Sequence, residues 1–375
     1  MILSTNFLSK GFVFFLALLI FPCLPNAEET GRNGSPQSGT NRNIAIFPVE
    51  NLSGTPAPLK EIRQVFIEEL QKQGIHVLKD ESFEKFMARH RIRYTGGLDR
   101  DTARAFKNEI GTDGVLITTL ESYSETNPPK ICLLSRLVST GDPPVILWME
   151  GIGLAGDDSP GILGLGLIED PKELREKALK SVTGSLVRYL STGMDRKKTD
   201  GKKRKFRPKL AYQSSALDLE KKYRVAVIPF FNRSERKYAG EILVLHFIRQ
   251  LKRFENFEVI EPGMVRQELL NLRMIMQDGV SLADADAIFA TLNGDLLVSG
   301  RVMDYQDYQG VWGKPKVGFS TMVIERKSRE VVWSSNSYNG GDDGVFFFDR
   351  GRVNTAHAMA SQMVQLVAKM MASLR

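Results

Sequence analysis

The chain has 375 residues, enough for two or three domains that each bury a core. Its 42% hydrophobic and 25% charged residues are close to average soluble usage and exclude a wholly disordered chain, a collagen-like chain and a polytopic membrane protein. Residues 196–209, with nine basic residues and one acidic residue, account for the net charge of +7. The folded parts therefore lack the basic excess that nucleic-acid binding needs, and we expect no nucleic-acid partner.

The N-terminus is organised like an export signal. A polar leader with one cation precedes an uncharged apolar run at 11–24, and Ala27 offers a small residue for cleavage. Residues 1–27 are therefore predicted to be a signal peptide, which places the protein in the periplasm, free or associated with the outer membrane. Cys23 is an alternative lipidation site, but Ile20 and Phe21 are bulky where lipoprotein cleavage needs small residues. We expect export without lipidation.

Residues 28–43 are polar, rich in Gly, Ser and Asn, and have nothing to bury, which predicts a flexible tether. Without Cys23 the mature chain keeps only Cys132, so no intramolecular disulfide is expected. Cys132 lies in the apolar segment ICLLSRLV and is expected in the core.

The rest of the chain is an internal repeat. The segment from Ile44 to Ser53 recurs 181 positions later, from Val225 to Ser234, and the offset becomes 182, then 185, then 180 along the chain. Matched pairs are Phe66 and Phe247, Arg91 and Arg273, Ala103 and Ala285, Tyr123 and Tyr305, Trp148 and Trp333, and Leu186 and Leu366. This collinearity over about 150 residues predicts tandem domains at 44–191 and 222–375, joined by a basic linker at 192–221.

Each copy opens with an apolar run rich in β-branched residues, IAIFPV or RVAVIPFF, as expected of a central strand covered on both faces. Apolar residues at helical spacing follow at 59–73 and 240–252. The second strands, HVLKD and EVIEP, end at an expected N-cap, Asp80, and at Pro262, which suits a first helical turn.

A further helical segment, rich in Ala in the second copy, and a third strand, GVLITTLESY or DLLVSGRVMDY, come next. Short hairpins follow, pairing 133–138 with 145–148 and 321–324 with 331–333, and a closing helix ends each copy. The predicted fold class is α/β (α+β), with two tandem copies of a mixed-sheet domain and helices packed on the sheet.

The segments VAVIPFFNRS, FEVIEPGMVRQELL and NGDLLVSGRVMDY of the second copy carry a family resemblance. Over about 80 residues they resemble the α/β domain shared by the curli secretion channel subunit (CsgG), the TolB N-terminal domain and the lipoprotein activators of peptidoglycan synthases (LpoB), and the first copy is a weaker version. The resemblance implies a periplasmic or outer-membrane-associated protein that acts by binding other proteins.

Motifs for catalysis, cofactors and metals give no consistent site. Gly151, Gly153 and Gly156 match GxGxxG after a strand, but Asp157 and Asp158 follow, where they would repel phosphate. The four histidines occupy no equivalent positions in the two copies and lack metal-ligand spacing. We therefore expect no enzyme activity, no cofactor and no metal.

Two short polar motifs occur in both copies. The pair Asp157 and Asp158 recurs as Asp342 and Asp343, and two adjacent carboxylates make a poorer cation site than a hydrogen-bonded turn. Asn51-x-Ser53 recurs at 232–234 and resembles a glycosylation sequon, but its place just after a strand favours a turn.

Two features are candidate partner-binding sites. Asp342 and Asp343 are followed by Phe346, Phe347 and Phe348, which either cover the core or form an exposed patch for a partner, since three consecutive Phe cannot all face inward on an extended segment.

The basic linker, with Lys202, Lys203 and Arg204, is either a solvated spacer or a segment attracted to anionic lipid headgroups or acidic envelope polymers.

The sequence thus predicts a non-enzymatic exported envelope protein that binds other envelope proteins, in assembly or secretion at the outer membrane. The alternatives are a lipoprotein activator of a periplasmic cell-wall or export enzyme and an unrecognised periplasmic enzyme.

Overall fold

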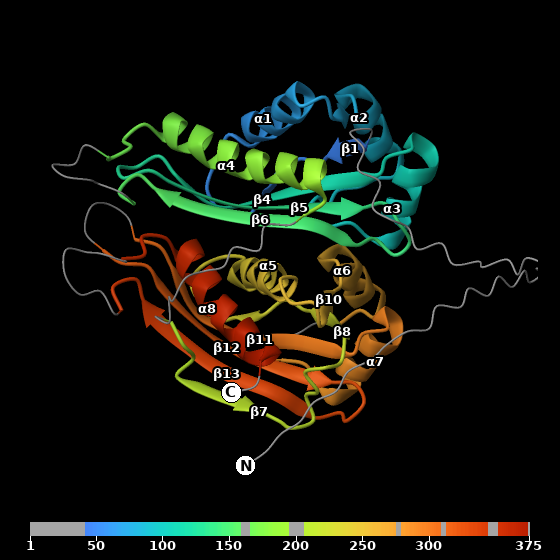
Figure 1. Ribbon diagram of the computed structural model, residues 1–375, viewed down its shortest axis with the longest axis vertical. Coiled ribbons are helices and arrows are strands. Elements are labelled where there is room, and N and C mark those ends of the chain that lie inside the picture. Colours follow the sequence, from blue (N-terminus) through green and yellow to red (C-terminus); the bar gives the residue numbers. More distant parts are fainter. Residues whose placement is uncertain are drawn as a thin grey trace, which may run out of the picture. The chain divides into compact units, whose positions relative to one another are not determined.

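The structure is a computed structural model that describes residues 42–158, 166–194, 206–274, 279–308, 313–343 and 352–373 (Figure 1). The described residues all belong to one compact unit. Among the helices of the described residues, none has the length and apolar character needed to span a bilayer.

The first repeat follows the predicted order of elements, with a two-residue strand added after the first. Its elements are β1 (Asn43–Ile46), β2 (Glu50–Asn51), α1 (Leu59–Lys72), β3 (His76–Val77), α2 (Asp80–Arg89), α3 (Arg100–Ala105), the π-helical turn η1 (Phe106–Ile110), β4 (Gly114–Ser124), β5 (Lys130–Ser139), β6 (Ile146–Ala155) and α4 (Pro171–Thr192).

The second repeat has the same order and is preceded by one extra strand. Its elements are β7 (Leu210–Gln213), β8 (Tyr223–Val227), β9 (Phe231–Asn232), α5 (Ala239–Leu251), β10 (Phe257–Val259), α6 (Pro262–Asn271), α7 (Leu282–Leu292), β11 (Leu296–Gln306), β12 (Lys316–Glu325), β13 (Val331–Gly340) and α8 (Ala356–Ala372).

The two sheets share one topology. Sheet A runs β3-β1-β4-β5-β6 and sheet B runs β10-β8-β11-β12-β13-β7, with the short β2 and β9 pairing with β4 and β11. The first strands pair in parallel and the long hairpins pair antiparallel, so both sheets are mixed and the predicted fold class is confirmed.

Three local details differ from the expectation. The hairpin strands β5, β6, β12 and β13 have 10 residues each, because the alternating pattern continues beyond the apolar runs that suggested shorter strands. Lys79, not Asp80, caps α2, since Asp80 is already helical and pairs with Arg63 at 2.8 Å. The predicted linker contains β7, whose residues pair with the edge of β13.

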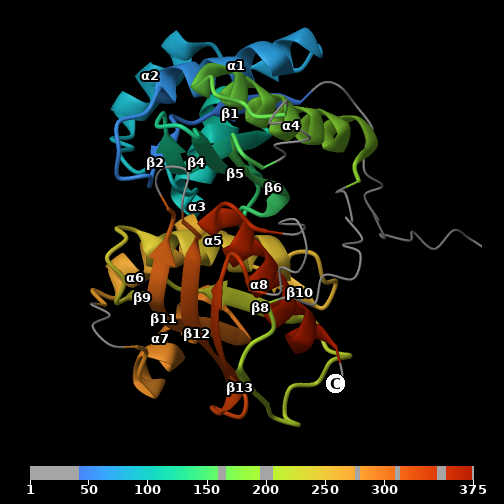
Figure 2. The same ribbon diagram turned by 90° about the vertical axis from the view of Figure 1, so that its left-hand side faces the viewer.

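Helices α1 and α4 form one layer, and α5 and α8 form a second layer that is enclosed between the two sheets (Figure 2). Helices α6 and α7 pack with Ala226, Ile228 and Leu297 on the other face of sheet B. Helices α1 and α4 cover one face of sheet A, where Phe66 and Leu179 pack against Trp148. Helices α5 and α8 cover the equivalent face of sheet B and also pack against the second face of sheet A. The core of the second repeat therefore continues into the first.

Candidate functional site

The contact between the repeats holds most of the buried polar interactions discussed below. Two glycines of β6 allow the helices of the second repeat to approach sheet A closely. A Cβ at Gly151 would lie 2.7 Å from Leu134 and 3.4 Å from Arg249 of α5, and a Cβ at Gly153 would lie 2.9 Å from the ring of His357 on α8. The GxGxxG match thus serves helix-on-sheet packing across the repeats.

A fully buried polar cluster lies at this contact. Glu121 occupies a β-bulge in β4, between the paired residues Leu120 and Ser122, and bulges commonly redirect a side chain next to a site. Its Oε2 lies 2.5 Å from Nδ1 of His357 and 3.2 Å from Nε2 of His246, and its Oε1 accepts a hydrogen bond from Tyr305 at 2.5 Å. Glu121 comes from the first repeat and its three partners from the second.

The cluster has a defined charge state. Burial opposes ionisation of Glu121, but the neighbouring His357 and His246 outweigh it and hold the pKa of this carboxyl below its usual range. Burial lowers the pKa of His246 to about 4. Burial, with Glu121 nearby, raises the pKa of Tyr305 well above its ordinary value. The cluster therefore presents a carboxylate to a phenol donor and to a His246 that is neutral near pH 7.

Two imidazoles and one carboxylate are a donor set that Zn²⁺ accepts, and their ligand atoms lie within 4.8 Å of one another. The outer nitrogens, Nδ1 of His246 and Nε2 of His357, are buried without a hydrogen-bond partner. A metal on the inner nitrogens would leave protons on these outer nitrogens with no acceptor, whereas metal-bound imidazoles normally donate to one. The geometry fits a hydrogen-bonded connection between the repeats better than a metal centre.

Buried ion pairing reinforces the same contact. Arg136 of β5 donates to both carboxylate oxygens of Glu261, at 3.0 and 3.1 Å, and to the carbonyl of Gly96 at 2.6 Å. Glu261 also accepts from the backbone N–H of Leu98. Both charged side chains are at most 1% exposed. Such a pair constrains which surfaces meet more than it adds to stability.

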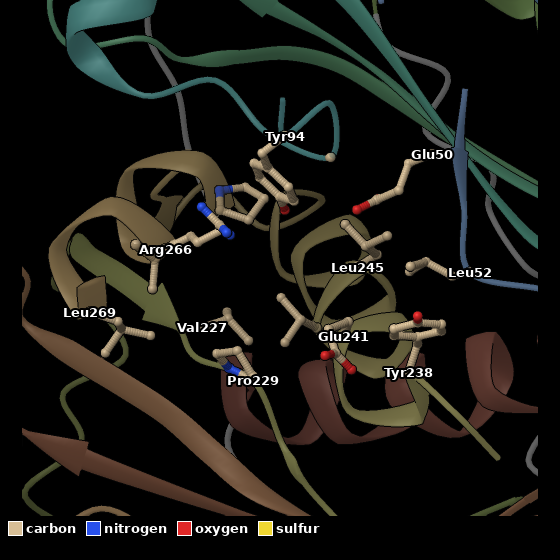
Figure 3. Close-up of a pocket in the computed structure, with 14 residues that line it drawn as sticks. Glu50, Leu52, Tyr94, Val227, Pro229, Tyr238, Glu241, Leu245, Arg266 and Leu269 are labelled. Carbon is tan, nitrogen blue, oxygen red and sulfur yellow. The ribbon is translucent and has the colours of Figure 1, made fainter. Parts of the chain in front are cut away.

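A pocket of about 290 Å³ opens beside this contact (Figure 3). Its floor comes from the second repeat and includes Val227, Val244 and Val265. The first repeat adds Glu50 and Tyr94 as its other wall. The pocket is therefore made by both repeats together.

The polar groups of the pocket are few and distinct. The Arg266 guanidinium lies 4.2 Å from the ring centre of Tyr94. Burial raises the pKa of Glu50, although Thr119 donates a hydrogen bond to its carboxylate at 2.9 Å. Tyr238 has a left-handed backbone at φ 61°, an uncommon conformation for a residue with a bulky side chain.

The free edge of each sheet is treated differently. In sheet B the carbonyls of Val332 and Asn336 accept hydrogen bonds from Ser214 and Lys209, on either side of β7. In sheet A the equivalent strand β6 ends the sheet, and no described strand pairs with its outer side. The equivalents of Val332 and Asn336 are Leu147 and Gly151. Within the described residues, the outer edge of β6 therefore has no strand partner.

Both predicted turns are confirmed. Asp158 accepts from the N–H of Ala155 at 2.9 Å, and Asp343 accepts from the N–H of Gly340 at the same distance. Asp342 forms an ion pair with Lys314 at 2.7 Å. The side chains of Asn51 and Asn232 accept from Ser53 and Ser234 two residues on, at 2.9 and 3.0 Å. Cys132 is buried, as expected.

The other predicted site residues lie outside the described residues: Cys23, Lys202, Lys203, Arg204, Phe346, Phe347 and Phe348. Asp157, the partner of Asp158, accepts a hydrogen bond from Tyr308 of the second repeat at 2.9 Å. The sequence did not indicate that His246, His357 and Glu121 converge. One signal was available, because the residues equivalent to them are Val65, Lys177 and Met303, which share none of their chemistry.

No family model and no curated protein matches the chain. Solved structures similar to it include a PelC dodecamer from Paraburkholderia phytofirmans, with 17% identity and a TM-score of 0.31 over 44% of this chain and 97% of that chain. Lipoprotein GNA1162 from Neisseria meningitidis has 18% identity and a TM-score of 0.28 over 38% of this chain and 98% of that chain. The LpoB C-terminal domain from Salmonella enterica has 13% identity and a TM-score of 0.24 over 31% of this chain and 82% of that chain. The neighbours thus include lipoproteins, and likenesses this weak carry no conclusion about function.

Proposed function

We propose that the protein is a non-enzymatic, exported envelope protein that binds another protein by adding one of its strands to the edge of β6. The observation that carries this proposal is the contrast between the two sheet edges: β13 is covered by β7, and β6 has no described strand beside it. An unpaired edge is a ready template for an extended segment of another chain.

The pairing of β7 with β13 indicates what such a segment looks like. β7 is a four-residue strand, antiparallel to β13, and it carries Leu210 and Tyr212 on one face. A partner segment on β6 would use backbone hydrogen bonds to Leu147, Met149 and Gly151 for affinity. It would use alternate side chains for specificity.

The signal peptide predicted at 1–27 supports an envelope location for this binding, in assembly or secretion at the outer membrane. If Cys23 is acylated, the same edge would serve a lipoprotein activator of a cell-wall or export enzyme. The segment 346–348 and the basic residues 202–204 stay proposed as additional contacts, with a protein and with an anionic surface respectively.

The test compares two variants at one edge position. Leu147→Pro removes the backbone N–H of a residue at the bulge of β6, where Pro is tolerated, and Leu147→Ala keeps that N–H. Mature wild-type protein should capture a partner from envelope extract, Leu147→Ala should capture it as well, and Leu147→Pro should lose it.

Amide hydrogen exchange of the captured complex then locates the contact. Protection of residues 147–151 on binding is expected. Capture by the proline variant at wild-type level, or protection confined to another surface, would overturn strand addition at β6.

A further inference from the structure

We propose that the pocket between the repeats binds a small zwitterionic ligand with an apolar body, such as a free amino acid or a dipeptide with aliphatic side chains. This site is separate from the edge of β6 and does not depend on the proposed protein binding. It rests on how the pocket differs from the equivalent surface of the first repeat.

The pocket exists because two large side chains of the first repeat are small in the second. Arg63 and Phe83 are replaced at the equivalent positions by Val244 and Val265, both of which line the pocket. In the first repeat, Arg63 donates to the carbonyl of Ile46 at 3.0 Å and lies 5.2 Å from the ring centre of Phe83.

The equivalent surface of the first repeat is a wider groove of about 710 Å³ with several charged lining residues, Arg63 among them. In the second repeat, valines stand at both positions, and Val227 at the end of β8 lines the pocket. Glu50, Leu52 and Tyr94 of the first repeat then wall the space. The result is a concave apolar site rather than an open charged surface.

Charged groups of opposite sign lie on opposite sides of this site. Figure 3 shows the Arg266 guanidinium beside Tyr94 on one side, and the carboxylates of Glu50 and Glu241 away from it on the other. Arg266 and Glu241 form no ion pair with any described residue, and both are exposed at the rim. Within the described residues, the Glu50 carboxylate accepts a side-chain hydrogen bond from the hydroxyl of Thr119 alone.

This arrangement specifies the chemistry of the ligand. A carboxylate would bind Arg266, whose planar guanidinium is already oriented by the Tyr94 ring, and an ammonium would bind Glu241 or Glu50. An aliphatic side chain would fill the space over the valines. Because ligand pockets usually begin at about 300 Å³, a cavity of about 290 Å³ suits a ligand of one or two amino acid residues.

The conformation of Tyr238 gives independent support. This residue lines the pocket and immediately precedes α5. It adopts φ 61°, a left-handed conformation usually taken by glycine. Backbone strain of this kind clusters at ligand sites, where it fixes the position of a side chain. Tyr238 thus holds its ring at the pocket mouth next to Glu241.

The test uses leucyl-leucine as the probe, with the mature protein containing both repeats. Binding is measured by isothermal calorimetry and by the rise in melting temperature. Free leucine distinguishes a single amino acid from a dipeptide, while N-acetyl-leucine lacks the ammonium and leucine amide lacks the carboxylate. We expect both blocked compounds to bind at least tenfold more weakly than the zwitterion, since each loses a hydrogen bond to a charged group.

Variants assign the binding to this pocket. Arg266→Gln and Glu241→Gln should each weaken binding tenfold or more. The matched controls Glu84→Gln and Lys60→Gln change the equivalent positions of the first repeat and should leave affinity unchanged. Val265→Phe restores the large residue of the first repeat and should abolish binding.

Three results would overturn the proposal. These are no binding of leucine or leucyl-leucine at millimolar concentration, equal binding of the blocked compounds, and equal losses in the pocket and control variants. Loss of partner capture in Leu147→Pro with normal dipeptide binding would leave both sites standing as separate functions.

Discussion

Helices α1 and α5 occupy equivalent positions in the two repeats, but α1 faces solvent on one side and α5 is enclosed between the sheets. α1 buries four of its 14 residues, on one side only, whereas α5 buries 11 of its 13 residues, including a histidine and a glutamine. An amphipathic helix covers one sheet and faces water, and a helix that is apolar all round must be enclosed. The second repeat therefore completes the core of the first, although both descend from one pattern.

The two sheets differ in the complementary sense. The face of sheet A that meets α5 and α8 carries Leu134, Gly151 and Gly153, whereas the equivalent positions of sheet B are Ser320, Asn336 and Tyr338. Gly151 and Gly153 admit helices closely, and Asn336 and Tyr338 are exposed. On β12 and β13, sheet B therefore carries polar side chains where sheet A accepts helices of the other repeat, as the outer faces of capping units do in repeat proteins.

The largest effect should come from breaking the buried pair across the repeats. Arg136→Met leaves the carboxylate of Glu261 buried without its cation and should lower the free energy of unfolding by about 3 to 5 kcal/mol, measured by urea denaturation. Arg104→Met, which removes an exposed pair with Asp142, should change it little. Equal losses of unfolding free energy in the two variants would mean that the buried pair at the repeat contact contributes no more to stability than the exposed pair.

Acid should weaken the contact through His246. Its pKa is about 4 in the folded protein and 6.5 ordinarily, so folding favours the neutral ring. The free energy of unfolding is therefore unaffected by this group above about pH 6.5 and decreases as pH falls toward 4, by up to about 3 kcal/mol.

Urea midpoints between pH 7 and pH 4.5 should show this slope in the wild type and in His76→Gln, because His76 is exposed. The slope should be flatter in His246→Gln, which keeps a donor for Glu121. An unchanged slope in His246→Gln would assign the acid sensitivity to other groups.

Two glycine-to-alanine changes should have opposite signs. Gly153→Ala forces a methyl against the ring of His357 and should cost about 1 to 3 kcal/mol, as overpacking does. Gly184→Ala in α4 meets nothing within 4 Å and should gain about 0.5 to 1 kcal/mol, because alanine favours the helix. Thermal denaturation of both variants checks the difference, and a stabilised Gly153→Ala would contradict the close contact.

The smallest effect should be a gain. The folded-state pKa of Glu50 is raised by burial, so its carboxylate is disfavoured in the folded protein at neutral pH. Glu50→Gln should therefore unfold at a slightly higher urea concentration than wild type at pH 7, and the difference should vanish below the unfolded pKa near 4.5. A gain that persists at pH 3.5 would indicate a cause other than this charge.

The sequence predicted the order of elements because each copy repeats the same apolar periods and breaks. It also predicted the turns at Asp158, Asp343, Asn51 and Asn232, since these depend on hydrogen bonds to backbone within three residues. Such features are local, and duplication shows each of them twice.

The site was not predictable in the same way. His246 and His357 lie 125 and 236 residues after Glu121 in the sequence. Only the packing of one repeat on the other brings the three side chains together. The pocket likewise depends on residues that differ between the copies, such as Val244 in place of Arg63. Comparing the copies for differences would have pointed to these positions, whereas their similarities pointed to the fold.

The enclosed position of α8 has a consequence for how the chain must mature. A chain synthesised from its N-terminus presents the apolar face of sheet A early, while α8, which covers part of it, lies at 356–372. That face stays without this cover during the synthesis of the 200 residues that separate β6 from α8. The first repeat therefore needs protection from aggregation until the second is made, and an attempt to produce it alone should yield an insoluble fragment.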